Sequence, residues 1–221
     1  MTSEGKPVKA GPTFRWRLVL TQILLISVGV AVIAGIGKLA YSLWPAPAAP
    51  SSSGQALIGG PFQLVDVDGK PADQRLLEGK WTTVFFGYSF CPDVCPATLT
   101  TLNAAKARLG AKADKLQVVF VSIDPQRDTP AQLKTYLSSP AFPQPIVGLT
   151  GTPEQIKAVA RAYKVYYAKA EGTKAGDRDY LMDHASAIYL MNPKGQFGRL
   201  VDPRLSPDDM AKAIGEGMAG R

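Results

Sequence analysis

Two runs of β-branched and aromatic residues, with a helical pattern between them, constrain the fold of this chain most strongly. Residues 81–86 (WTTVFF) and 116–123 (LQVVFVSI) have the composition of strands that are buried on both faces. Between them, residues 96–109 carry apolar side chains at helical spacing and are followed by Gly110, a typical helix end. A strand, a helix and a second strand in this order predict a βαβ unit with parallel strands.

The flanking segments predict the rest of one α/β domain over residues 57–221. A βαβ core followed by two strands and a helix, with a cysteine motif directly after the first core strand, is the thioredoxin-like arrangement, and residues 111–165 include an insertion. The further elements that we expect are a strand at 62–67, a helix at 129–138, a strand at 146–149, a helix at 152–163, a hairpin or loop at 168–180, strands at 187–191 and 197–201, and a helix at 206–218.

Residues 18–37 form a run without a single charge. As a helix, such a run is long enough to cross the ~30 Å hydrocarbon core of a bilayer once. We therefore expect a cytoplasmic N-terminus over residues 1–17, one transmembrane anchor over 18–40 and a Pro/Ala/Ser-rich linker over 41–56. A cleaved signal peptide is the alternative, although the apolar run is longer than the usual signal core.

The distribution of charge supports export of the domain and excludes nucleic acid as a partner. The net charge is +7, and the first 50 residues hold five basic residues and one acidic residue. Most of those basic residues precede the apolar run, which by the positive-inside rule keeps the N-terminus in the cytoplasm. No basic stripe with aromatic residues follows. We expect a single-pass protein of the inner (cytoplasmic) membrane with a periplasmic domain.

Cys91 and Cys95 are the only cysteines of the chain, and they directly follow a core strand. Ligand sites in parallel sheets form at this end of the strands. A separation of four residues places both thiols on one face of a helical turn, and a helix N-terminus lowers the pKa of a thiol. The α-carbons of such a pair lie about 6 Å apart, so a disulfide can close. In an exported domain, a structural or redox disulfide is the simplest interpretation of the pair alone.

His184 is the only histidine, and it lies just before the expected strand 187–191. Redox-active thioredoxin-like domains normally carry a cis-proline there, facing the thiols, and this chain has none. We expect His184 to face Cys91 and Cys95. Two sulfurs and one imidazole nitrogen favour Cu(I), and imidazole also tolerates Cu(II), whereas Zn(II) would need a fourth ligand. Asp183 or Asp124 could orient the histidine through a hydrogen bond.

Other side chains of the right chemical type have simpler interpretations. Met182 and Met191 could be soft ligands, but methionines in strands usually fill the core. Asp124, Asp128 and Asp183 could act as acids or bases, but aspartates next to Pro or Thr usually cap helices and turns. We therefore expect structural roles for most of these side chains.

Three separated motifs carry a family resemblance: GYSFCPDVCP at 87–96, VSIDPQRDTP at 121–130 and YLMDH at 180–184. In this order they resemble the Sco/SenC family, the copper proteins of cytochrome c oxidase assembly, over roughly residues 57–220. The resemblance implies that Cys91, Cys95 and His184 bind copper. It also implies a membrane-anchored metallochaperone that takes copper from an upstream donor protein and delivers it to the CuA centre of oxidase subunit II.

We expect a metallochaperone rather than an enzyme, and one alternative follows from the same residues. A thiol-disulfide reductase that keeps the cysteines of the oxidase subunit reduced needs only Cys91, Cys95 and an exchange partner. The absent cis-proline and the wide cysteine spacing weigh against a general reductase. A copper or redox sensor would leave no distinctive mark in the sequence.

Overall fold

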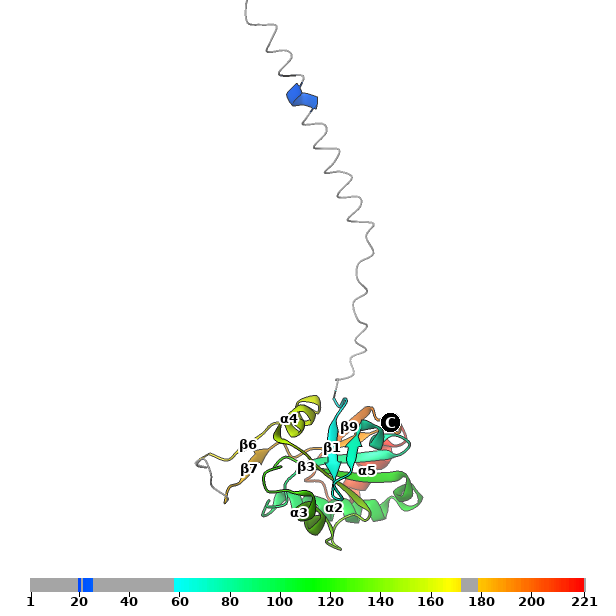
Figure 1. Ribbon diagram of the computed structural model, residues 1–221. Helices are drawn as coiled ribbons and strands as arrows, with labels where there is room; N and C mark the ends of the chain where they lie inside the picture. Colours follow the sequence, from blue (N-terminus) through cyan, green and yellow to red (C-terminus); the bar gives the residue numbers. More distant parts are fainter. Residues whose placement is uncertain (1–19, 21, 26–57, 172–178, 221) are drawn as a thin grey trace, which may run out of the picture. The chain divides into compact units, whose positions relative to one another are not determined.

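The computed structural model describes most of the chain, in the ranges 20, 22–25, 58–171 and 179–220 (Figure 1). The chain divides into two units, residues 1–55 and residues 56–221. In the first unit the described residues, Leu20 and 22–25, are helical.

The predicted cytoplasmic segment 1–17 and linker 41–56 lie outside the described residues, and the predicted anchor 18–40 lies almost wholly outside them. Among the helices that the structure does describe, none has the length and apolar character needed to cross a bilayer.

A seven-stranded mixed sheet forms the centre of the second unit, in the order β2-β1-β5-β4-β3-β8-β9. The three middle strands β5, β4 and β3 are parallel to one another, and the outer strands join them antiparallel. The strands of this sheet are β1 (Gln63–Asp66), β2 (Pro71–Asp73), β3 (Trp81–Gly87), β4 (Leu116–Ser122), β5 (Ile146–Thr150), β8 (Ile188–Met191) and β9 (Phe197–Val201). A separate antiparallel pair consists of β6 (Tyr167–Lys169) and β7 (Met182–His184).

Helices cover both faces of the sheet. They are α2 (Val94–Arg108), α3 (Pro130–Leu137), α4 (Pro153–Ala162) and α5 (Pro207–Gly217), with short 3₁₀ helices η1 (Gln74–Leu77) and η2 (Gly110–Lys115). Phe120 of β4 contacts Tyr136 of α3, whereas Phe86 of β3 contacts Tyr163 at the end of α4. Since Phe120 is paired with Phe85, and neighbouring strand residues point to opposite faces, α3 and α4 lie on opposite sides. Helix α2 packs against α5.

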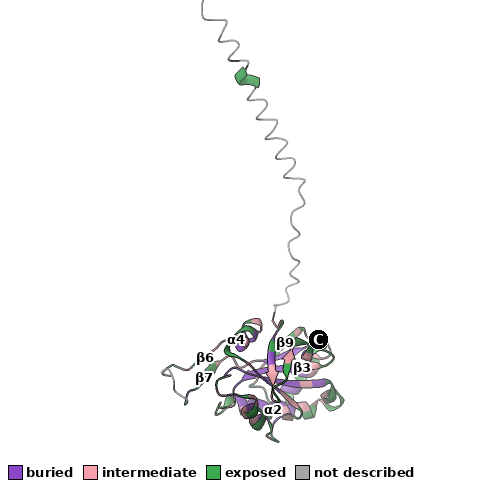
Figure 2. Ribbon diagram, in the orientation of Figure 1, coloured by how far each residue is buried: buried purple, intermediate pink, exposed green. Residues whose placement is uncertain are grey.

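The core confirms the prediction of strands that are buried on both faces. All residues of β3 after Trp81 are buried, as are all residues of β4 except Gln117, and the centre of the sheet is accordingly coloured as buried in Figure 2. Burial of both faces is what parallel strands between two helical layers require. This arrangement confirms the predicted thioredoxin-like α/β domain.

Helix α2 begins at Val94, two residues before the predicted start at residue 96. The prediction placed Pro96 at the first helical position, where proline is common. In the structure Pro96 is the third residue of the helix. None of the first four backbone N–H groups of a helix has an intrahelical partner, so proline costs no hydrogen bond there either. The earlier start brings Cys95 into the first turn of α2.

Candidate metal and thiol site

The loop after β3 and the first turn of α2 position the two thiols. Cys91 is half-buried, Cys95 is fully buried, and both are free thiols. The backbone N–H of Cys95 donates to Cys91 Sγ at 3.4 Å, which holds the two residues together. Gly87 makes room for this packing, because a Cβ at that position would lie only 2.8 Å from Cys95 Sγ.

His184, the last residue of β7, reaches the thiols from a distant part of the chain. Its Nε2 lies 3.7 Å from Cys95 Sγ. Its Nδ1 lies 3.2 Å from the carbonyl oxygen of Ala185; in the tautomer whose Nδ1–H donates a hydrogen bond to this oxygen, the Nε2 lone pair faces the sulfur. The ring also contacts the ring of Tyr88 edge-on, with centroids 6.0 Å apart.

The separation of sulfur and nitrogen suits a shared metal ion. An ion bonded to a thiolate at about 2.3 Å and to an imidazole nitrogen at about 2.0 Å holds those atoms roughly 3.5–3.8 Å apart at ordinary bond angles. The 3.7 Å between Cys95 Sγ and His184 Nε2 lies in this range. Within the described ranges, however, no three Cys, His, Asp or Glu side chains already converge as a finished ligand shell.

The two thiols differ in acidity. The hydrogen bond from the Cys95 thiol, together with backbone N–H groups, lowers the pKa of Cys91 well below its ordinary value. The thiolate of Cys91 and burial raise the pKa of Cys95 above its ordinary value. At neutral pH the pair therefore consists of an accessible thiolate and a buried thiol that donates to it. Such a thiolate serves equally as a nucleophile and as a soft metal ligand.

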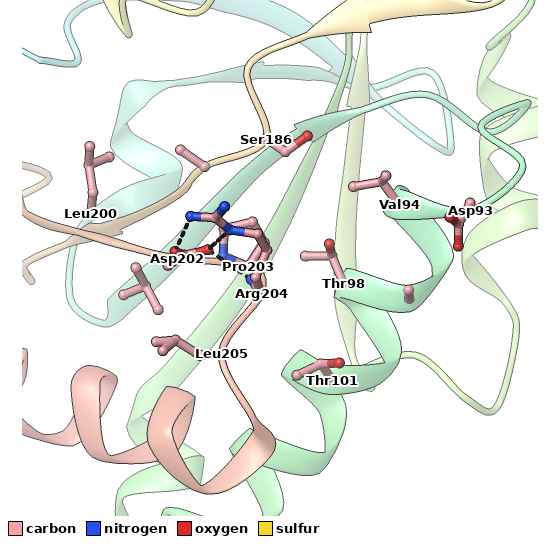
Figure 3. A pocket seen from close by; sticks show the side chains of 13 residues that line it. Asp93, Val94, Thr98, Thr101, Ser186, Leu200, Asp202, Pro203, Arg204 and Leu205 are labelled. Carbon is pink, nitrogen blue, oxygen red and sulfur yellow. Dashed lines mark hydrogen bonds and ion pairs between the residues drawn. The ribbon is translucent and has the colours of Figure 1, made fainter.

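A cavity opens beside Cys91, and a larger groove adjoins it. The cavity, of about 320 Å³, is lined by Cys91, His184 and Met182 among others. The groove, of about 880 Å³, runs between the start of α2, at Asp93 and Val94, and the β9–α5 connection (Figure 3). The cavity and the groove share Asp93, Val94 and Ser186 in their walls.

The two acidic residues expected beside His184 lie in different surroundings. Asp183 is exposed and lies in the wall of the same cavity as Cys91 and His184. Asp124 is buried, forms an ion pair with Arg127 and accepts a hydrogen bond from the hydroxyl of Tyr180 at 2.6 Å. The carbonyl of Ala185 holds His184 Nδ1 instead.

Met182 and Met191 are both buried, but they differ in what they line. Met191 is fully buried in β8 and belongs to the core. Met182 is also buried, but it lines the cavity beside Cys91 and His184.

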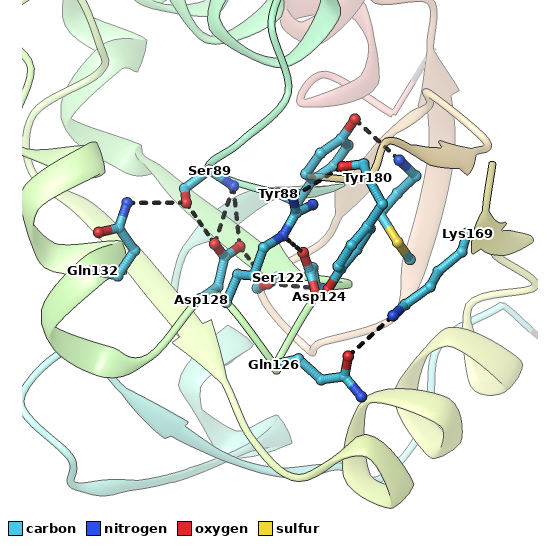
Figure 4. A network of polar contacts seen from close by, with 11 residues as sticks. Tyr88, Ser89, Ser122, Asp124, Gln126, Asp128, Gln132, Lys169 and Tyr180 are labelled. Carbon is cyan, nitrogen blue, oxygen red and sulfur yellow. Dashed lines mark hydrogen bonds and ion pairs between the residues drawn. The ribbon is translucent and has the colours of Figure 1, made fainter. Parts of the chain in front are cut away.

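Asp128 lies directly under the cysteine loop with no exposed surface. Its carboxylate accepts hydrogen bonds from the Ser89 hydroxyl at 2.5 Å, the Ser89 backbone N–H at 3.0 Å and the Ser122 hydroxyl at 2.6 Å (Figure 4). Burial raises the pKa of this carboxyl in spite of these bonds. Asp128 thus ties the loop that carries Cys91 to the end of β4.

Sequence reasoning assigned no role to three residues that the structure places around the site: Tyr88, Arg127 and Tyr180. All three lie inside the motifs that carry the family resemblance. An arginine and two tyrosines inside motifs that also hold the candidate ligands are the signal that could have identified them.

Comparison with known proteins identifies relatives over nearly the whole described domain. The SCO1/SenC family model matches residues 50–219. The mitochondrial protein SCO1 homolog 1 of Arabidopsis thaliana is 37% identical over 96% of the chain, and the chain spans 63% of that relative's length. Protein SenC of Rhodobacter capsulatus is 36% identical over 90% of the chain and 87% of its own length.

A solved structure gives the same fold. The structure of ScoI from Bradyrhizobium japonicum with copper bound is 42% identical to this chain and has a TM-score of 0.63. The alignment covers 72% of this chain and 98% of the ScoI chain.

Proposed function

Because the chain belongs to the SCO1/SenC family, we propose that it is a copper metallochaperone of cytochrome c oxidase assembly. Cys91, Cys95 and His184 are the proposed copper ligands. The observation that carries the proposal is the 3.7 Å separation of Cys95 Sγ and His184 Nε2, with Cys91 beside them. Copper-bound relatives of the same fold support it.

The chain's own residues prepare the site for a soft ion. Cys91 supplies a thiolate, and Cys95 loses its proton when copper replaces that proton as the partner of the sulfur. The hydrogen bond from Nδ1 of His184 to Ala185 fixes the tautomer whose Nε2 can bind. Cys91, the more exposed of the two thiols, lines the same cavity as His184 and is the proposed third ligand.

Delivery to the CuA centre of oxidase subunit II is the proposed outcome. The test mixes the reduced, copper-loaded chain with the metal-free, reduced copper domain of subunit II, then adds a mild one-electron oxidant and follows the absorption spectrum of the mixed-valence CuA centre. We expect the spectrum to develop with wild type and not with His184→Ala. If His184→Ala bound copper with the wild-type affinity, the three-ligand site would be contradicted.

The membrane anchor is a separate part of the proposal, supported by the uncharged run at residues 18–37. We propose that this run holds the chain in the membrane with its C-terminal domain on the exported side. Protease treatment of intact spheroplasts tests the topology. The domain should be degraded from outside, and its protection would contradict the orientation.

A second candidate function is reduction of the disulfide of the copper-accepting subunit. It is favoured by the unequal acidity of the thiols, since a low-pKa Cys91 can attack a disulfide and a neighbouring Cys95 can then resolve the mixed disulfide. The two electrons pass to the subunit, and Cys91 and Cys95 end as a disulfide. Cys95→Ser should trap the mixed disulfide with the oxidised subunit domain; reduction of that domain without any copper transfer would reverse the ranking of the two functions.

A further inference from the structure

The site is assembled from two pieces of chain, and the histidine lies outside the strands of the main sheet. Cys91 and Cys95 follow β3 in the centre of the seven-stranded sheet. His184 ends β7, which among the described strands pairs only with β6, and each of these two strands has three residues. A two-stranded hairpin is at best marginally stable by itself. The short connection to Ile188, which pairs with Phe85 of β3, anchors His184 on one side, and contacts between the hairpin and the cysteine loop hold it on the other.

Arg127 lies between these two pieces, with 13% of its side chain exposed. Its Nη1 donates to the carbonyl oxygen of Tyr180 at 2.9 Å, four residues before His184. Its guanidinium carbon also lies 3.6 Å from the centre of the Tyr180 ring and 4.7 Å from the centre of the Phe90 ring. Phe90 precedes Cys91. One side chain thus contacts the residue next to a thiol and the segment that leads to the imidazole.

Further hydrogen bonds fix the geometry around Arg127. Its Nε donates to Asp124, and the other oxygen of that carboxylate accepts from the Tyr180 hydroxyl at 2.6 Å, so Asp124 orients both partners (Figure 4). Nearer to the site, the backbone N–H of Met182 donates to the hydroxyl of Tyr88 at 3.2 Å. The planar guanidinium makes stacking contacts and directed hydrogen bonds at the same time, which a lysine ammonium cannot reproduce.

We propose that Arg127 is the positioning residue for His184, fixing β7 against the cysteine loop so that the imidazole meets Cys95 and Cys91. The proposal rests on the copper site proposed above, but Arg127 acts on the protein before any metal is present. Asp124 and Tyr180 contribute to this positioning, because their contacts hold the guanidinium of Arg127 in place.

The metal-free readout uses the fact that His184 is the only histidine in the chain. Its ring protons give one set of NMR signals, which in the reduced wild type should report a ring packed against Tyr88. In Arg127→Ala and Arg127→Lys of the full chain we expect these signals to move toward those of a free imidazole. Arg108→Ala removes an arginine that pairs with Asp208 elsewhere on the surface, and it should leave the signals unchanged.

The metal readout is a thermodynamic cycle with Cu(I) and a chromophoric competitor. Loss of an orienting contact behind a ligand typically weakens metal affinity by about 10–100-fold. We expect a loss of this size for Arg127→Ala and Arg127→Lys, and a change below about twofold when Arg127→Ala is added to His184→Ala. Near-UV circular dichroism verifies that each variant is folded, and Arg127→Lys serves as the test if Arg127→Ala is not.

Each outcome separates the inference from the function on which it rests. Unchanged copper affinity in His184→Ala would contradict the copper site, while the NMR signals would still decide the role of Arg127. An equal loss of affinity with and without His184 would show that Arg127 acts elsewhere. If Arg127→Lys kept the wild-type NMR signals and copper affinity, only the positive charge of Arg127 would matter and not its guanidinium geometry. Either of the last two results overturns the proposal.

Discussion

At the scale of single residues, Cys91 and Cys95 are chemically different thiols. We predict that iodoacetamide modifies Cys91 selectively, and that the reaction stays fast well below the ordinary thiol pKa of about 8.5. The reason is that the Cys95 thiol stabilises the Cys91 thiolate and lowers its pKa. Mass spectrometry of the alkylated, metal-free chain at a series of pH values measures the midpoint for each thiol.

The matched variant for this prediction is Cys95→Ala, which removes the largest cause of the shift. The midpoint for Cys91 should rise in this variant. Equal labelling of both thiols in the wild type would contradict the assignment, since the buried Cys95 has a raised pKa.

Asp128 provides a second prediction at this scale. Asp128→Asn exchanges an acceptor for a donor opposite Ser89 and Ser122, and should lower the free energy of unfolding by about 1–3 kcal/mol. Because the folded-state pKa of Asp128 is raised above the unfolded value of about 3.9, its carboxyl stabilises the fold most when protonated. That contribution is present below the unfolded pKa and is lost as pH rises through the folded pKa.

The cost of Asp128→Asn should therefore be larger near pH 4 than at pH 7. Urea denaturation of both proteins across this range measures it, with Asp208→Asn at the surface as the control. A cost that grows with rising pH would contradict the predicted sign.

The candidate ligands could be predicted from the chemical type of their side chains. The residues around them could not, because their roles depend on how each side chain is oriented in the fold. Cys91, Cys95 and His184 are the chain's only soft ligands apart from methionine, so composition alone singles them out. Asp183 was expected to orient the histidine; it lies in the wall of the cavity that His184 also lines, whereas the atom nearest to Nδ1 of His184 is the carbonyl oxygen of Ala185. The contacts of Arg127 join residues more than 50 positions apart, and no local pattern predicts such a contact.

At the scale of elements, the β6–β7 hairpin is the least supported part of the site. We predict that backbone amides of Met182–His184 exchange with solvent at least about tenfold faster than those of the buried strands β3 and β4, because local opening there costs less than global unfolding. Hydrogen exchange with mass spectrometry measures the difference. Copper should slow exchange in β7, and no slowing in β7 would argue against His184 as a ligand.

The elements that could be predicted are those whose pattern is decided by burial. Strands β3 and β4 consist mostly of β-branched and aromatic residues. Helices α3 and α4 follow Thr-Pro pairs in which the threonine hydroxyl caps the helix. Strands β6 and β7 are too short to show a period, and their surroundings resemble a loop in composition. The sequence predicted only a hairpin or loop over 168–180, and the paired strands flank that segment.

At the scale of the whole molecule, copper binding and folding stability are linked. A ligand that binds only the folded chain at 100 times its dissociation constant adds about 2.7 kcal/mol to the free energy of unfolding. We predict that reduced chain with excess buffered Cu(I) melts roughly 5–10 °C higher than the metal-free chain. Calorimetry measures the shift; His184→Ala should lose most of it, and an equal shift in that variant would contradict specific binding.

The overall topology followed from the order of elements, because parallel strands need helical crossovers and these leave few arrangements. The distance between the cysteine loop and the histidine did not follow, because it depends on how the hairpin packs against residues 88–90. That His184 faces the thiols was expected from its place in the fold, where redox-active thioredoxin-like domains carry a cis-proline.

The long separation in sequence between Cys95 and His184 gives the site a further property. His184 follows Cys95 by 89 positions, so a chain that is still being synthesised or exported presents the two thiols before the imidazole. Only a chain that has completed both β3 and the later hairpin can offer all three groups at once. Only molecules whose synthesis and folding are complete would therefore retain copper.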